Sequence, residues 1–317
     1  MHPVSFLKTF SMSAACILTV FFILSGCGSE TEYKTVNFGE TVKQSDEPDT
    51  RQGDRVLNVA VGAMISPGQT LVNYQELVDY IGEKTNTDAR LIQRKTYGEV
   101  NDLLGTGEVD IAFICTGPFV LGKEEMSFEA LATPVVRSEP YYRAYLIVHK
   151  DSDFSELEDL TGGIFAFTDP ESNTGAMVPS FWLAQKNETP DSFFKRVHFT
   201  YSHDNSILAV ASSLVDGASV DGHIWEYYNE RDPVHTSQTR VIKKSRLFGS
   251  PPLVASAFID KQLKEEISRA VINMHEDETG KAILEHLAID RFEAFREEWY
   301  EGVAEIKKEI KNAQNRQ

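Results

Sequence analysis

Hydroxyl and amide side chains gather in one short segment of the chain, directly after an apolar run at residues 164–168. The segment contains Ser172, Asn173 and Thr174, and Pro179 follows it. Proline lacks an N–H and fits a helix only near its first turn, so the three polar residues are expected at a helix N-terminus. Free backbone N–H groups, the positive end of the helix dipole and two hydroxyls can hold an anion there. Ordinary N-capping is the alternative, because Ser, Asn and Thr are also common caps.

A histidine stands at a second strand-to-helix turn. His203 follows the apolar run at residues 197–201, and Asp204 or Asn205 is the expected N-cap of the next helix. Parallel sheets bind ligands at the carboxyl ends of their strands, where His203 and Ser172 would both project. The pattern favours one site formed by the two turns, although a lone histidine often serves only the fold.

Tyr97 and Asp221 occupy comparable positions after other strand candidates. Tyr97 follows the second strand of the first half, and Asp221 follows residues 217–220. A carboxylate repels a dianion unless it accepts a hydrogen bond from a protonated ligand oxygen. Position alone leaves both a ligand contact and a structural role open for these two residues.

No enzyme signature accompanies these residues. The chain lacks a Walker loop, Gly-x-Gly-x-x-Gly, Gly-x-Ser-x-Gly and Cys-x-x-Cys, and no two histidines have a helix-face metal spacing. A hydrolase that uses Ser172 or Ser202 with His203 is an alternative, which release of product from a phosphate ester would reveal. The sequence predicts binding without turnover, with no catalytic residue, metal or cofactor.

The charge of the chain bears on its partners. Asp and Glu number 48 against 31 Lys and Arg over 317 residues, a formal net charge of −17. Nucleic-acid binding is disfavoured, because phosphate backbones require a positive footprint. Hydrophobic residues at 41% indicate a globular chain with a real core, and the length suggests about two domains of ~100–200 residues.

Alternating strands and helices must position these residues. Apolar runs that read as strands fall at residues 56–62, 89–93 and 109–113 in the first half, and at 164–168, 197–201 and 217–220 in the second. The alternation predicts an α/β fold with two lobes, each a mostly parallel sheet flanked by helices. The strand candidates 142–148 and 241–242 are expected to be the crossings between lobes.

The expected division of the chain follows from these patterns. Lobe one takes residues 55–142, lobe two takes 143–240, and 241–317 returns to lobe one and supplies the C-terminal helices. One docked helix is predicted from apolar residues at helical spacing, which are Phe292, Phe295, Trp299, Val303, Ile306 and Ile310.

The N-terminus reads as a targeting segment. Residues 1–26 resemble a lipoprotein signal peptide that ends before Cys27, the expected lipidation site, and 27–54 is a polar tether. A single-pass anchor is the alternative, but the apolar stretch 13–24 is shorter than the ~20 residues of a membrane span. The protein is therefore expected on the bacterial envelope, facing the periplasm or the exterior. Cys115 is left as a lone thiol, expected in the core.

Seven segments occur in an order that resembles a known family. They are 61–67, 95–99, 107–112, 169–175, 201–210, 215–216 and 250–252. Together they resemble the phosphate/phosphite/phosphonate-binding proteins of ABC importers. The resemblance implies a type II periplasmic-binding fold whose two lobes are joined by two crossings and close on a ligand. By that resemblance, the pocket is lined by Tyr97, Ser172, Asn173, Thr174, His203 and Asp221.

The resemblance also implies a function. A lipid-anchored receptor would capture a small phosphorus oxyanion (phosphite, phosphate or an alkylphosphonate) and deliver it to an ABC permease. A sensing module of the same fold, signalling to a kinase or receptor, is the alternative. Phe119 stands where such proteins often have tyrosine, and His223 stands where relatives that bind aminoalkyl ligands have an acid. An ammonium group beside His223 is expected to lack a carboxylate partner.

The lipid anchor gives a first test. Replacing Cys27 by serine should leave an unprocessed precursor or release the protein from the membrane fraction, because serine cannot carry the lipid. Fractionation and immunoblotting measure this outcome. A correctly cleaved Cys27→Ser protein that stays membrane-bound would contradict the prediction.

Overall fold

The computed structural model describes residues 55–314, which belong to one compact unit, Arg51–Gln317. The signal peptide, Cys27 and the tether lie outside the described residues. None of the helices described between residues 55 and 314 has the length and apolarity to cross a membrane.

Lobe one is built on a six-stranded sheet. Its strands, in spatial order, are β13 (Arg291–Ala294), β4 (Glu129–Val135), β12 (Leu253–Ala255), β3 (Ile111–Phe113), β1 (Val56–Val61) and β2 (Asp88–Gln93). Strand β1 pairs in parallel with β2 and β3, as the alternation predicted, whereas β12 and β13 return late in the chain and pair antiparallel. The parallel part of the sheet places the carboxyl ends of β1, β2 and β3 at one edge.

Helices cover both faces of this sheet. They are α2 (Pro67–Thr85), α3 (Tyr97–Thr106), α4 (Thr116–Met126), α9 (Lys261–Asn273) and α10 (Glu278–His286). Along β1, Val59 and Val61 pack with α2, α9 and α10, whereas Ala60 packs with α3 and α4. This alternation follows from the two-residue period of a strand. Phe119 on α4 is buried against Phe295 and Tyr300.

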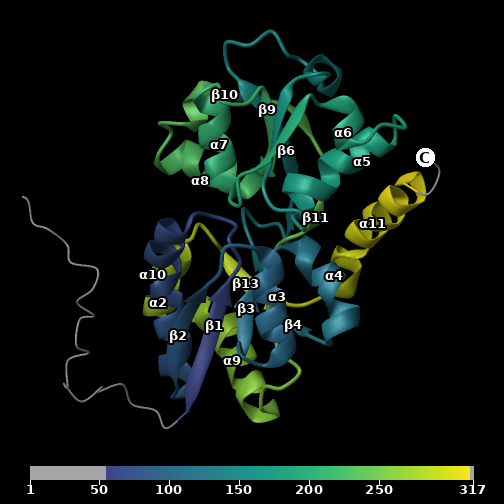
Figure 1. The fold of residues 1–317 in the computed structure, drawn as a ribbon. Coiled ribbons are helices and arrows are strands. Elements are labelled where there is room, and N and C mark those ends of the chain that lie inside the picture. Colours follow the sequence, from purple (N-terminus) through teal and green to yellow (C-terminus); the bar gives the residue numbers. More distant parts are fainter. Residues whose placement is uncertain (1–54, 315–317) are drawn as a thin grey trace, which may run out of the picture. The chain divides into compact units, whose positions relative to one another are not determined.

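Lobe two is built on a five-stranded sheet. Its strands, in spatial order, are β10 (Thr239–Lys244), β6 (Ala144–His149), β9 (Gly217–Asp221), β7 (Ile164–Phe167) and β8 (Arg196–Phe199). The helices are α5 (Val178–Ala184), α6 (Pro190–Phe193), α7 (His203–Ala211) and α8 (Gly222–Arg231). Helices α7 and α8 lie on one side of the sheet and α5 and α6 on the other (Figure 1). Leu146 and Val148 accordingly face α5, while Tyr145 and Ile147 face α7 and α8.

The crossings between the lobes differ from those expected. Two short strands, β5 (Tyr141–Tyr142) and β11 (Phe248–Gly249), form an antiparallel pair where the chain enters and leaves lobe two. Most of the candidate 142–148 and all of 241–242 lie instead in β6 and β10, inside the second sheet. A two-residue strand has no periodicity to detect, so the sequence pattern pointed to its longer neighbours. The lobe boundaries at 142/143 and 240/241 stay a prediction, and the second of them falls inside β10, whose residues all belong to the lobe-two sheet.

The C-terminal helix is shorter than predicted. Phe292 lies in β13 and Trp299 in a 3₁₀ turn, Glu297–Trp299, so the helix α11 comprises only Glu301–Gln314. Apolar spacing did not reveal that residues 291–294 use their backbone to pair with β4. Val303 and Ile306 of α11 are buried in the lobe-two core beside α5. The other 3₁₀ turns of the described residues are Leu157–Leu160, Thr236–Gln238 and Met274–Glu276.

Candidate anion-binding site

All six residues predicted for the pocket are buried at turns that follow strands. Ser172 and its two neighbours follow β7, Tyr97 is the first residue of α3, His203 the first of α7, and Asp221 the last of β9. Each exposes at most 3% of its surface. Burial of so many polar groups is costly without partners, so their hydrogen bonds show which atoms serve the fold and which do not.

The Ser172–Thr174 segment begins a π-helical turn, Asn173–Met177, that continues into α5. Ser172 is its N-cap and accepts a hydrogen bond from the N–H of Gly175 at 3.0 Å, so the capping interpretation holds for Ser172. Pro179 is near the first turn of α5, as predicted. A Cβ at Gly175 would overlap the Thr168 hydroxyl, so only glycine fits there.

Two polar atoms of this turn have no partner within residues 55–314. The Asn173 amide donates to the Tyr142 hydroxyl at 3.0 Å, but its Oδ1 is unpaired. The Thr174 hydroxyl is also buried and unpaired. Capping therefore explains Ser172 and leaves the Asn173 and Thr174 side chains available to a ligand, at the kind of π turn that often marks functional sites.

His203 has a defined tautomer. Its Nδ1 lies 3.1 Å from the backbone nitrogen of Asp221 and 3.1 Å from the Thr168 hydroxyl. A backbone N–H can only donate, so Nδ1 accepts and the ring proton lies on Nε2. Burial lowers the pKa of His203 to about 3, with a smaller opposing effect of Asp204. The neutral ring therefore offers an Nε2–H that has no partner among the described residues.

Asp221 combines a structural and a titrating role. Its Oδ1 accepts hydrogen bonds from the N–H groups of His223 at 2.8 Å and Ile224 at 3.3 Å, which caps α8. Burial raises the pKa of Asp221 to about 7, and the two backbone donors oppose this rise. Near neutral pH the ionised carboxylate can therefore accept a hydrogen bond from a protonated ligand oxygen. The protonated carboxyl group can instead donate a hydrogen bond to a ligand oxygen.

Tyr97 lies opposite these groups, on lobe one. Its ring packs with Ala63, Met64 and Cys115, and its hydroxyl is buried without a partner in the described part of the chain. Burial raises the pKa of Tyr97 well above its ordinary value, so the hydroxyl keeps its proton and can donate. Cys115 is a buried free thiol, as expected.

Direct contacts join the two lobes around the site. The His203 N–H donates to the Met64 carbonyl at 2.9 Å, and the Tyr97 N–H donates to Asp169 at 3.1 Å. Asp204 accepts a hydrogen bond from the Ser66 N–H at 3.0 Å, and the prediction that Asp204 or Asn205 caps α7 is wrong. Ser202 is the cap instead, because its hydroxyl lies one residue earlier and reaches the Asn205 N–H. The lobes are therefore closed on each other in this structure.

The sequence pattern missed three features of the site. Ser250, directly after β11, has a buried hydroxyl with no partner in residues 55–314, and only its place before two prolines marked it. The Tyr142 hydroxyl supports Asn173 from the crossing strand. Glu226 lines a cavity together with His223, so a carboxylate does lie near that position, although Arg137 and Tyr145 already bind it.

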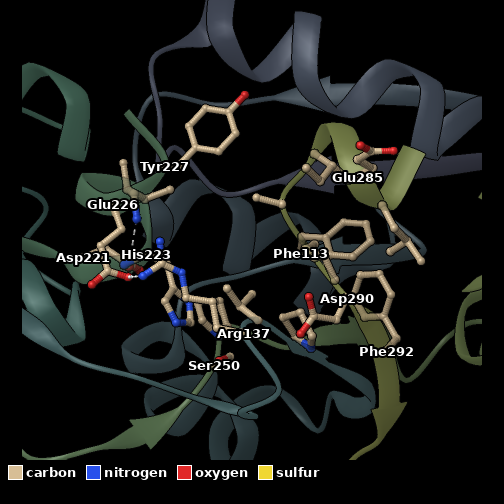
Figure 2. Close-up of a pocket in the computed structure, with 18 of the residues that line it drawn as sticks. Phe113, Arg137, Asp221, His223, Glu226, Tyr227, Ser250, Glu285, Asp290 and Phe292 are labelled. Atoms are coloured by element: carbon tan, nitrogen blue, oxygen red, sulfur yellow. Dashed lines mark hydrogen bonds and ion pairs between the residues drawn. The ribbon is translucent and has the colours of Figure 1, made fainter. Parts of the chain in front are cut away.

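Of the site residues described above, only Asp221 and Ser250 line that cavity, and the other unpaired side chains are not among its lining residues. It has a volume of about 590 Å³. Figure 2 shows Asp221, His223 and Glu226 on one side of it, and Phe113 and Phe292 on the other. Within residues 55–314, no cluster of His, Cys, Asp and Glu could hold a metal ion.

Comparisons with known proteins identify the family of the chain. A family model described as the phosphonate periplasmic substrate-binding protein of ABC transporters matches residues 59–300. The phosphonates-binding periplasmic protein of Escherichia coli is 26% identical over 296 residues, covering 90% of this chain and 79% of that protein. The phosphate-import protein PhnD of Mycolicibacterium smegmatis is 22% identical over 269 residues, covering 80% and 78%. The resemblance inferred from the seven segments is confirmed.

Solved structures share the fold. A binding protein of a Pseudomonas aeruginosa ABC phosphonate transporter superposes with a TM-score of 0.78 at 23% identity, covering 83% of this chain and 88% of that one. PhnD1 of Prochlorococcus marinus, in complex with methylphosphonate, gives a TM-score of 0.73 at 17% identity, covering 81% and 98%. The predicted two-lobed periplasmic-binding fold is confirmed.

Gly117 gives a test of lobe closure. A Cβ here would overlap the Glu171 carbonyl of lobe two and lie 2.8 Å from the Asn173 nitrogen. We expect Gly117→Ala to weaken methylphosphonate or phosphite binding at least tenfold, about 1.4 kcal/mol, by calorimetry. Gly105→Ala is the control, because a Cβ there meets only the flexible Met126 side chain. Equal affinities of both variants would refute the prediction.

Asp221 gives a test by pH. Because its pKa is raised from 3.8 to about 7, the folded protein keeps a proton that the unfolded chain releases between these values. The stability contributed by this group therefore falls as pH rises through that window. Asparagine can cap α8 but cannot ionise, so Asp221→Asn should gain on the order of 3 kcal/mol relative to wild type between pH 4 and pH 8.

Urea unfolding of both proteins at each pH measures this gain. Comparison with wild type is required because His203 and His223, whose pKa values burial lowers to about 3 and about 4, change stability in the opposite direction in acid. A stability difference that is the same at pH 4 and pH 8 would show that Asp221 ionises normally.

Proposed function

Because the chain belongs to the family of phosphonate periplasmic substrate-binding proteins of ABC transporters, we propose that it captures a phosphorus oxyanion between its lobes. Phosphite, phosphate and alkylphosphonates are the candidate ligands, and an ABC permease is the proposed recipient. The proposal includes binding without turnover and a lipid anchor at Cys27.

One observation carries the proposal: buried, unpaired polar groups surround the closed junction of the lobes. Tyr97, Thr174, His203 and Ser250 each present an O–H or N–H with no partner within residues 55–314. Such groups cost ~1–3 kcal/mol each when they stay unsatisfied, so a ligand with several acceptor oxygens would relieve them together. A tetrahedral phosphoryl group has that form.

The charges around the site favour an anionic ligand that carries a proton or can take one up. No lysine or arginine among residues 55–314 is buried, so neutral donors and the first turns of α7 and the π-helix would hold the ligand. Asp221 in its ionised form accepts a hydrogen bond from a P–OH group, whereas sulfate has no proton at neutral pH to give. The arrangement therefore favours phosphorus oxyanions over sulfate.

A thermal-shift screen of the purified protein tests the function. Phosphite, phosphate, methylphosphonate and 2-aminoethylphosphonate form the panel, and sulfate is the control. A ligand at ~100 times its dissociation constant should add ~2.7 kcal/mol of apparent stability. The absence of a shift with every phosphorus compound would refute the proposal.

Two substitutions of His203 give a sharper prediction. Asparagine can replace the acceptor at Nδ1, whereas glutamine can replace the donor at Nε2. His203→Asn keeps an acceptor near Nδ1 for the Asp221 N–H and loses the distal donor. We expect this variant to lose at least tenfold in affinity for the best ligand of the screen, since a hydrogen bond to a charged group contributes ~1.5–3 kcal/mol.

Two controls accompany this variant. His203→Gln keeps a distal donor and should lose less affinity than His203→Asn, and the exposed His198→Asn should bind like wild type. Calorimetry gives the affinities, and the melting temperature confirms folding. If His203→Asn binds as tightly as His203→Gln, then Nε2 does not contact the ligand.

A further inference from the structure

Helix α2 of lobe one begins without a cap from its own side chains. Ser66 occupies the N-cap position, but its hydroxyl forms no capping hydrogen bond, and no acid stands in the first turn of the helix. Helix α3 has the complete arrangement, because Glu99 accepts a hydrogen bond from the N–H of its N-cap residue, Thr96, at 2.9 Å. The corresponding N–H of Ser66 must find its acceptor outside α2.

Asp204 of lobe two supplies that acceptor. Its two carboxylate oxygens lie 3.0 and 3.2 Å from the backbone nitrogen of Ser66. Within the part of the chain that the structure describes, this carboxylate has no hydrogen-bond partner in its own lobe. The negative charge also faces the positive end of the dipole of α2, which is 19 residues long. Asp204 therefore completes α2 across the junction of the lobes, and only while the lobes are in contact.

Local structure does not require an acid at position 204. Ser202 already caps α7 by accepting a hydrogen bond from the Asn205 N–H. A negative charge next to His203 also repels an anion that binds there, because like charges repel each other. The contact with α2 gives the carboxylate a role that the cap of α7 does not.

The same segment of lobe one holds the start of α7 in register. The His203 N–H donates to the Met64 carbonyl at 2.9 Å, while the Ser66 N–H donates to Asp204. Residues 64–66 and the first turn of α7 therefore exchange hydrogen bonds in both directions. The bond of Asp204 to α2 thus forms next to the residue that offers its Nε2–H to the proposed ligand.

Asp169 makes a related contact, but its bonding differs from that of Asp204. It accepts a hydrogen bond from the Tyr97 N–H at the start of α3 at 3.1 Å. It also accepts one from the Glu171 N–H of its own lobe at 2.9 Å, so part of its bonding survives when the lobes separate. Of these two acids, Asp204 is the one whose hydrogen bonds depend entirely on closure.

From these contacts we propose that Asp204 raises the affinity for the ligand by capping α2 when the lobes close, without binding the ligand itself. The inference rests on the proposed capture of a phosphorus oxyanion between the lobes. A contact that favours the binding-competent form lowers the apparent dissociation constant. Because the ligand enters while the lobes are apart, the cap slows dissociation and leaves association unchanged.

The rate constants of an alanine variant test the inference. We expect Asp204→Ala to raise the dissociation rate constant of the best ligand of the screen at least tenfold, because a hydrogen bond to a charged group is lost. The association rate constant should change less than threefold. Stopped-flow tryptophan fluorescence at about 0.15 M salt, which screens distant charges, measures both. Asp191→Ala is the control, because Asp191 is an exposed first-turn acid of α6 in the same lobe.

A variant of the donor shows whether Asp204 acts through α2. Ser66 has φ −59° and ψ 152°, angles that suit a proline before Pro67, so Ser66→Pro deletes the N–H and keeps the backbone direction. We expect it to dissociate as fast as Asp204→Ala, whereas Ser66→Ala, which keeps the N–H, should behave like wild type. Adding Asp204→Ala to Ser66→Pro should then change the dissociation rate constant less than twofold. Melting temperatures confirm that each variant is folded.

Two results would overturn the inference. One is a wild-type dissociation rate constant in Asp204→Ala. The other is an equal effect of Asp204→Ala with and without Ser66→Pro, which would mean that Asp204 acts within α7 and not on α2. Absence of binding by every phosphorus compound would instead refute the proposed function.

Discussion

The hydrogen bond from the backbone N–H of Asp221 to Nδ1 of His203 joins the end of β9 to the start of α7, inside the protein. Because a backbone N–H cannot accept, this bond assigns the ring proton to Nε2, and burial keeps the ring neutral. Asp221 also caps α8 through its side chain. The starts of α7 and α8 and the position of the proton on His203 therefore all depend on the end of β9.

A site made of neutral donors places a demand on the rest of the fold. Buried polar atoms of Tyr97, Thr174 and His203 have no partner among residues 55–314, and burial of such atoms costs stability unless another group bonds to them. Stability must come from elsewhere, and the apolar clusters on both faces of each sheet supply it. Helix α11 follows the last strand of the lobe-one sheet. It nevertheless adds Val303 and Ile306 to the core of lobe two.

The candidate anion site and the adjoining cavity differ in chemistry. Around the proposed anion, hydrogen-bonding groups are buried and carry no fixed positive charge. The adjoining cavity has an aromatic wall that includes Phe113 and Phe292, and it also carries charged side chains, among them the ion pairs of Arg137 with Glu226 and Glu230. Arg137 and Ser138 have left-handed φ angles of 53° and 66°, a conformation that costs on the order of 1 kcal/mol. The ion pairs of Arg137 with Glu226 and Glu230 link this turn of lobe one to α8 of lobe two.

The sequence by itself determined the α/β class, the strands that carry the site residues and the family. Short apolar runs and turn residues are local signals, and they place Ser172, His203 and Asp221 after strand candidates without knowledge of the fold. Tertiary structure alone decided which polar atoms lack partners, since pairing of Nδ1 with a backbone N–H eighteen residues away leaves no local pattern. It also decided that Phe292 lies in a strand, that Asp204 binds the other lobe and that the buried Ser250 hydroxyl has no partner within residues 55–314. Each of these depends on backbone groups from distant segments, and side-chain periodicity does not encode their positions.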